Sequence, residues 1–339
     1  MAPQALKVED QLDLFFRRGM ILTDKKKHLE KMKHISYYRL KEFAQPYSKV
    51  TMYGEIPVIR YADISFDDVV KRYYQDKNLR IHLMHAIEKI EVSLKRNLSY
   101  ILGKKYGAYG YLDFSLWANK EKKTRFQLEE EQYKFKRDLL KTVRKSSLSE
   151  LREEKNLNED GFPSIWLASE ILMFGNLIHL IKLMSSKNQK ELAGFYNCKV
   201  TELLSWLKCL NFVRNICAHN SNVIDINLKT KPVIRSNWNE GYLYTTTDRS
   251  GGNLSTNRLA VIILIVTTLV HQINEKYKLE PIRSSLASIC RASDPDKGDK
   301  NAHLIGFANS SGALDLETFT KGKKRKKRRK QKVMKRRNY

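Results

Sequence analysis

The residues best suited to chemistry lie in one short segment, FVRNICAHNS, residues 212–221. The segment ends a stretch of helical periodicity and contains Arg214, Asn215 and His219. An unperturbed imidazole titrates at about pH 6.5, so it can take a proton from a ribose 2′-hydroxyl or give one to a leaving oxygen. A guanidinium can stabilise a pentacoordinate phosphorus, and an asparagine can orient the imidazole or a phosphate oxygen. These residue types therefore suit RNA cleavage without a metal ion.

The spacing of these residues limits how one chain could use them. Asn215 and His219 are four residues apart and share one face of a helix, whereas Arg214 lies about 140° around the helix from His219. A long side chain or a loosened last turn would be needed to bring them together. One motif also supplies one histidine, although acid and base roles are filled most simply by two. The sequence therefore predicts a homodimer in which two such helix ends face each other across a two-fold axis.

On residue types alone, a structural role is the alternative: the arginine caps the helix and the histidine packs under the next loop. Other catalytic patterns, such as a Gly-rich phosphate loop or an H-E-x-x-H pair, are absent from the sequence. None of the four cysteines has a C-x-x-C partner, and we predict neither a metal site nor a cofactor.

Two further pairs could carry chemistry but have simpler interpretations. Cys217 and His219 could form a nucleophilic pair, but a cysteine within an apolar stripe is typical of a helix core. Glu88 and Glu91 could form an acid–base couple, or a salt-bridged face with Lys95.

Positive charge is concentrated at the end of the chain. The 339 residues include 63 Lys and Arg against 37 Asp and Glu, a formal charge of +26. Residues 321–339 contain 13 Lys and Arg and no acid. Like charges at this density repel one another, so we predict a disordered tail that attracts RNA phosphates, or alternatively a merely solubilising one. The predicted phosphate-binding residues are Lys323, Lys324, Arg325, Lys326, Lys327, Arg328, Arg329 and Lys330.

Helical periodicity dominates the first two-thirds of the chain. Thr23 is the expected N-cap of a helix over 24–43, and Ser65 begins an S-x-x-D capping box that opens another. From Leu79 to Ile101 an apolar stripe runs at spacings of three and four residues. Similar helical blocks follow Pro163 and Val200.

Other segments differ in texture. Residues 48–62 predict a loop or small hairpin. Residues 119–158 are highly charged and predict an exposed helix with a weak apolar stripe (Phe126, Tyr133, Leu140), followed by a polar linker. Residues 223–255 predict an irregular insertion or small hairpin. The apolar run after Asn257 predicts a buried helix, with a strand as the alternative.

Tyrosines beside arginines are candidates for contact with RNA. Tyr37 and Tyr38 precede Arg39, and Tyr73 follows Arg72. Aromatic rings and guanidinium groups stack on bases, although core packing is the alternative for each tyrosine. Core positions are predicted for the aromatic residues with apolar neighbours, namely Trp166, Phe174 and Trp206.

No segment resembles a membrane anchor. The longest strongly apolar run, Leu259–Val270, is shorter than the ~20 residues that cross a bilayer. No N-terminal leader is visible. We therefore expect a cytoplasmic protein with no membrane partner.

Four segments follow one another in a particular order: HISYYRLKEFAQPY (34–47), FDDVVKRYYQDKNLRIHLMHAIEKIEVSLKRNLSYIL (66–102), FPSIWLASEILMFGNL (162–177) and WLKCLNFVRNICAHNS (206–221). Together they resemble the AbiD/AbiF-like Abi family of bacterial phage-resistance proteins, which belongs to the HEPN superfamily. The resemblance spans roughly residues 12–275. One departure is that Asn222, Val223 and Ile224 follow Ser221, where the family often has a further arginine.

The resemblance implies an all-α, HEPN-like helical bundle and a metal-independent endoribonuclease that acts in abortive infection. It assigns Arg214, Asn215 and His219 to the catalytic signature, at a dimer interface, and Glu170 to a supporting position. It also implies an RNA partner, since some AbiF-like members are associated with a small structured non-coding RNA. Two alternatives are a non-catalytic protein that holds such an RNA, and RNA binding by the basic tail alone.

These observations predict a division of the chain into regions. An N-terminal helical region covers 1–64, and a HEPN-like core covers 65–287 with the insertion near 223–255. A linker over 288–320 then leads to the basic tail.

Overall fold

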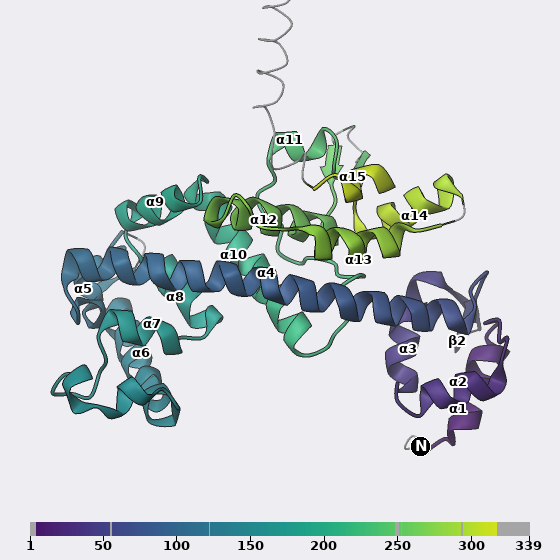
Figure 1. The fold of residues 1–339 in the computed structure, drawn as a ribbon, viewed down its shortest axis with the longest axis horizontal. Helices are drawn as coiled ribbons and strands as arrows, with labels where there is room; N and C mark the ends of the chain where they lie inside the picture. The colour runs from purple at the N-terminus through teal and green to yellow at the C-terminus, as the bar shows by residue number, and fades with distance from the viewer. Residues whose placement is uncertain are drawn as a thin grey trace, which may run out of the picture.

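One long helix organises the computed structural model, which describes residues 5–316 except Glu55, Lys122, 248–250, Gly252 and Ser293. This helix, α4 (Phe66–Tyr106), has 41 residues and is about 60 Å long, and the other elements pack along it (Figure 1). The predicted capping box at Ser65 is present, and the predicted stripe from Leu79 to Ile101 is buried. The tail predicted over 321–339, including Lys323 to Lys330, lies outside the described residues.

A first buried cluster surrounds the start of α4. Its elements are α1 (Val8–Arg17), α2 (Lys25–Met32), α3 (Tyr37–Ala44), a 3-10 turn (Gln45–Tyr47), β1 (Ser48–Tyr53) and β2 (Ile56–Tyr61). The strands pair antiparallel, which confirms the hairpin. The helix predicted over 24–43 is instead two helices, because Ser36 interrupts it and caps α3 by accepting a hydrogen bond from the Arg39 N–H. Asp24, not Thr23, caps α2.

The other end of α4 packs against a second group of short elements. This group contains five helices, α5 (Phe114–Trp117), α6 (Arg125–Lys145), α7 (Ile165–Ile171), α8 (Phe174–Leu183) and α9 (Ser186–Phe195). It also contains three 3-10 turns, at Gly110–Leu112, Ser149–Arg152 and Glu154–Asn156. Helix α6 is largely exposed, as predicted, but only part of its stripe is right: Leu140 is partly buried against the core, whereas Phe126 and Tyr133 are exposed. Leu128 and Leu139 are buried instead.

Trp166 also differs from its prediction, since half of its surface is exposed. Its ring lies over Gly103 of α4, where an added Cβ would come within 2.7 Å of the ring. The tryptophan therefore packs flat on the small residue and leaves its other face to solvent. Phe174 and Trp206 are buried, as predicted.

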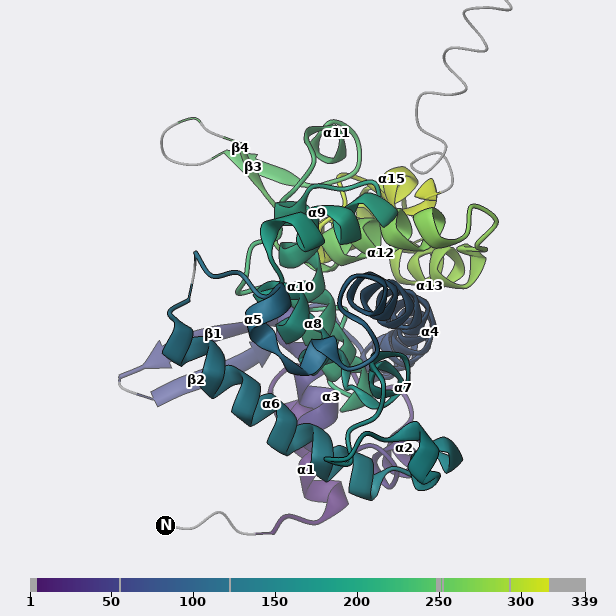
Figure 2. The same cartoon turned by 90° about the vertical axis from the view of Figure 1, so that its left-hand side faces the viewer.

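The remaining elements follow along the chain, and most of them lie on one side of α4, the upper side in Figure 2. They are α10 (Val200–Ala218), α11 (Ser236–Asn239), β3 (Thr245–Thr247), β4 (Asn253–Ser255), α12 (Leu259–Ile273), α13 (Glu280–Cys290), α14 (Pro295–Ile305) and α15 (Ser310–Leu314). The insertion contains the predicted hairpin, β3–β4. The run after Asn257 is a helix, α12, and the strand alternative is wrong.

The segment interpreted as a linker, 288–320, packs into the main core as far as it is described. Ile305 and Phe307 are fully buried. The Gly306 carbonyl accepts a hydrogen bond from the Tyr244 N–H at 2.9 Å, which fixes this segment against the insertion. This segment is therefore held in the core by a few buried apolar residues and a backbone hydrogen bond. It has no long apolar stripe, which is why the sequence pattern did not predict that it is buried.

The predicted all-α class is confirmed, with strands restricted to two small hairpins in the described residues. No helix in the described part of the chain is long and apolar enough to cross a bilayer.

Candidate active site

Helix α10, which carries the predicted catalytic residues, is fixed at its beginning by charge. The Glu202 carboxylate accepts a hydrogen bond from the Lys199 N–H at 2.7 Å and from Arg235 Nε at 2.8 Å. Behind this pair, Trp206 stacks on Trp238 with ring centroids 5.4 Å apart. The insertion therefore holds the first turns of α10 in place.

The end of α10 closes in a Schellman motif. Asn220 has a left-handed backbone with φ of 57°, a conformation that asparagine tolerates better than most residues. Its N–H donates to the Cys217 carbonyl at 3.2 Å, and the Ser221 N–H donates to the Ile216 carbonyl at 2.9 Å. The His219 N–H also keeps its helical bond to the Asn215 carbonyl, so the last turn is not loosened.

A buried ion pair on α4 holds the loop after this turn. Asp76 Oδ2 accepts from Arg80 Nε at 2.6 Å, and Asp76 Oδ1 accepts from the N–H groups of Val223 and Ile224 at 2.7 and 3.1 Å. Arg80 Nη1 donates to Asn220 Oδ1 at 2.8 Å. Burial raises the pKa of Asp76, against the opposing effect of these N–H donors and of Arg80. The network binds the residues that follow His219 to α4.

Arg72 extends this network by one turn of α4. Its Nη2 pairs with Asp225 Oδ1, and Asp225 Oδ2 accepts from Asn222 Nδ2 at 2.8 Å. The Arg72 side chain is almost entirely buried. Its guanidinium therefore anchors the loop, in addition to any contact it makes with RNA.

The three predicted catalytic residues emerge on different sides of α10. Asn215 and His219 are exposed on one face, which they share with the partly exposed Phe212. Arg214 is half-buried and lines a groove against α4. Within the described residues, none of these three side chains forms a hydrogen bond or an ion pair. One chain thus brings Asn215 and His219 together and keeps Arg214 apart.

The groove beside Arg214 has a volume of about 430 Å³ and is walled by one face of α4, with Glu88, Glu91 and Lys95 among its lining residues. Lys95 pairs with Glu91 at 3.5 Å, which confirms the salt-bridged interpretation of this face. Lys95 Nζ also donates to the carbonyl of Glu170 at 3.0 Å. The predicted supporting residue Glu170 therefore meets the groove through its backbone, while its side chain is exposed.

The predicted RNA-binding residues on α3 have separate environments. Tyr37 is buried against Phe15, with ring centroids 4.8 Å apart, so core packing explains it. Tyr38 is 76% exposed and remains available for stacking. Arg39 forms an ion pair with Glu42 at 2.9 Å on the same helix.

Burial makes a nucleophilic role for Cys217 unfavourable, because it raises the pKa of this thiol to about 12. The thiol is then protonated throughout the neutral range, whereas the thiolate is the reactive form. We expect Cys217→Ala to leave RNA cleavage and its dependence on pH between 6 and 9 unchanged. Parallel rate profiles of the two proteins would show this, and loss of cleavage by a folded Cys217→Ala protein would restore the Cys/His hypothesis.

Sequence reasoning missed Asp76 and Arg80, although the sequence contained a signal for Asp76. Counting back from Leu83 in steps of four and three gives Leu79, Asp76 and Arg72, so two charged residues continue the buried stripe. Charges on a buried helix face require partners. Their partners, in 220–225, could not be read from the pattern.

No group of three or more His, Cys, Asp or Glu side chains is placed to hold a metal ion in the part of the chain that the structure describes. Neither the curated proteins nor the solved structures contain a significant match to this chain. A family profile described as Abi-like protein matches residues 30–225, which include α4, α10 and the network between them. Because this match covers more than half of the sequence, the chain belongs to the Abi-like family, which points to a role in abortive infection.

Proposed function

We propose that this protein acts in abortive infection as an endoribonuclease of HEPN type, with an active site formed by Arg214, Asn215 and His219 of two chains. One observation carries the proposal. His219 and Asn215 are exposed side by side at a helix end that is held by a Schellman motif and a buried ion network. This support fixes the position of an exposed imidazole that forms no hydrogen bond or ion pair of its own among the described residues.

The chemistry follows from these side chains. One imidazole takes the proton of the ribose 2′-hydroxyl, and the oxygen attacks the adjacent phosphorus. A second imidazole gives a proton to the departing 5′-oxygen, so that the products are a 2′,3′-cyclic phosphate and a 5′-hydroxyl. The Arg214 guanidinium stabilises the additional charge on phosphorus, and the Asn215 amide orients the imidazole.

A second chain is part of this proposal because of the regular end of α10. Arg214 faces the α4 groove, and His219 faces solvent on another side. A two-fold axis beside the exposed face of α10 would supply the second histidine, and the long Arg214 side chains would reach the shared site from the adjoining grooves. The exposed ring of Phe212 on this face is a suitable apolar contact for the partner.

The test of the proposed function uses matched RNA and DNA strands with the same sequence and an end label. We expect cleavage of the RNA at equal rates with and without EDTA, products that end in a 2′,3′-cyclic phosphate, and no cleavage of the DNA, which lacks the attacking hydroxyl. Cleavage of the DNA strand or a requirement for a divalent ion would contradict the mechanism.

The second candidate function is a non-catalytic protein that holds a small structured RNA. The net charge of +26 favours it, because Lys and Arg bind phosphates without cleaving them. On this hypothesis the wild-type protein binds RNA and leaves it intact under every condition above.

A further inference from the structure

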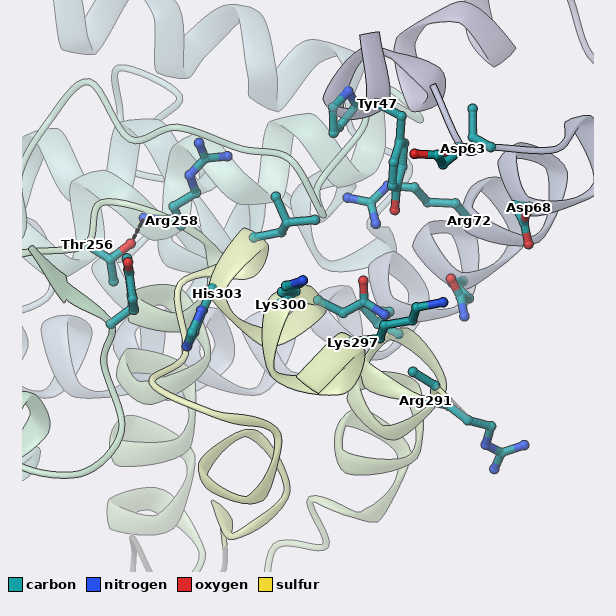
Figure 3. A pocket seen from close by; sticks show the side chains of 18 of the residues that line it. Tyr47, Asp63, Asp68, Arg72, Thr256, Arg258, Arg291, Lys297, Lys300 and His303 are labelled. Atoms are coloured by element: carbon teal, nitrogen blue, oxygen red, sulfur yellow. Dashed lines mark hydrogen bonds between the residues drawn. The ribbon is translucent and has the colours of Figure 1, made fainter. Parts of the chain in front are cut away.

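A large cavity lies apart from the catalytic motif, where four parts of the fold meet. Its volume is about 1170 Å³, and its walls come from the loops beside the N-terminal hairpin, the start of α4, the β3–β4 insertion and the α13–α14 region (Figure 3). We call this cavity the basic cleft. Cationic side chains line three of these four walls, namely Lys71, Arg72, Lys231, Arg258, Lys297 and Lys300, and Arg291 lies at the edge of the cleft.

Six of these seven cations have no ion-pair partner in the part of the chain that the structure describes. The exception is Arg72, which pairs with Asp225. Two acids, Asp63 and Asp68, also line the cleft, but Asp68 is engaged in the capping box of α4. The concave shape and the excess of one charge sign concentrate positive potential in this space.

Arg72 gives the cleft a built anion site. Its side chain is nine-tenths buried, and its Nε finds no hydrogen-bond partner in the described part of the chain. The guanidinium lies over the Tyr47 ring, 5.8 Å from its centroid, and Figure 3 shows it directed into the cavity. A buried N–H without a partner costs free energy, and a small shift of the guanidinium toward an oxyanion in the cleft would remove this cost.

Flat groups accompany the cations. Tyr47 lines one wall, and on another Tyr244 and His303 lie together with ring centroids 4.4 Å apart. Cations that follow a backbone and aromatic rings that accept bases are the two components of single-strand binding sites. The volume also exceeds the range of about 300–1,000 Å³ that is usual for small-molecule sites.

We infer that the basic cleft binds a stretch of single-stranded RNA, with phosphates on Arg72, Lys297 and Lys300 and bases against Tyr47, Tyr244 and His303. This inference rests on the proposed function for the identity of the ligand, and it places RNA at a second location, apart from the α10 site. Arg72 connects the two, because its partner Asp225 belongs to the loop that follows His219. An RNA phosphate on Arg72 competes with Asp225 and so acts on the loop beside the catalytic motif.

The test compares two double charge reversals with the same spacing. Lys297→Glu/Lys300→Glu changes the cleft, whereas Lys187→Glu/Lys190→Glu changes two exposed lysines three residues apart on α9. Both pairs are made in His219→Ala protein so that the RNA stays intact. Fluorescence anisotropy with a labelled 12-nucleotide single strand measures Kd at several salt concentrations, and circular dichroism verifies folding.

We expect the cleft variant to raise Kd at least tenfold. The logarithm of the association constant falls with the logarithm of the salt concentration, and this slope should become less steep by about 1.4, the value for two single-strand phosphate contacts. The α9 variant should change Kd less than twofold. Equal effects of the two variants, or no effect of either, would overturn the inference. Tight binding of ATP that excludes the single strand from the cleft would also overturn it, in favour of a free nucleotide.

The outcome is independent of the cleavage mechanism. If His219→Ala protein still cuts RNA, the proposed active site fails, and Kd is then measured with a single strand that carries 2′-O-methyl groups, so that the cleft and α9 variants still decide the inference. If cleavage depends on His219 but the cleft variant binds normally, the inference alone fails.

Discussion

Replacing His219 by alanine is expected to slow RNA cleavage by about 10²–10⁴-fold, the usual contribution of a positioned acid or base. The free energy of unfolding should change by less than about 0.5 kcal/mol, because the side chain is exposed. Arg214→Ala should slow cleavage by about 10²–10³-fold through lost stabilisation of the phosphorane. Single-turnover cleavage and thermal unfolding of each protein measure the two effects. Lys190→Ala, at an exposed position of α9 away from this face, is the control and should cleave normally.

Mixing wild-type and His219→Ala chains tests whether the site is shared. The mechanism needs one imidazole as the base and a second as the acid, so a heterodimer with a single His219 should be nearly as slow as the His219→Ala dimer. If the site lies between two chains, the cleavage rate after subunit exchange should therefore fall with the square of the wild-type fraction. A rate that falls in direct proportion to the wild-type fraction would mean that each chain works by itself, and the dimeric site would have to be abandoned.

The parts of this fold that could be predicted depend on neighbours in sequence. The stripe on α4 and the stripe on α10 follow from a period of 3.6 residues, and Ser65 caps a helix with a residue three positions away. Contacts between residues far apart in the sequence could not be predicted from the pattern. One example is Trp166, which packs against Gly103 on another helix and is half exposed.

In the candidate site too, the features that depend on neighbouring residues could be predicted, and the contacts between distant residues could not. The order of residue types in 212–221 indicated the chemistry and the shared face of Asn215 and His219. It did not indicate the buried support, because Arg80 reaches Asn220 across 140 positions of sequence. The basic cleft was missed for a similar reason: its lysines and arginines are dispersed over four segments, and each segment alone has an ordinary composition.

That buried support should have a large effect on stability. Asp76→Asn keeps an oxygen that can accept from the Val223 and Ile224 N–H groups, but it removes the negative charge beside Arg80. The guanidinium is 5% exposed, so it would be left buried without a counter-charge, at a cost of about 3–5 kcal/mol. Chemical denaturation followed by circular dichroism measures this loss. Asp138→Asn, which removes an exposed acid from an ion pair on α6, is the matched control and should change stability by less than about 0.5 kcal/mol.

Two further measurements distinguish the effect of the Asp76 charge on stability from its effect on RNA cleavage. Adding Arg80→Met removes the stranded cation, so the double variant should be less destabilised than the sum of the single changes. At a temperature where the protein stays folded, Asp76→Asn should still slow RNA cleavage, by up to about 100-fold, because the loop after His219 is no longer held to α4. Normal cleavage by a destabilised Asp76→Asn protein would mean that the network stabilises the fold without positioning the histidine. The exposed end of α10 would then lose the observation that makes it a candidate active site.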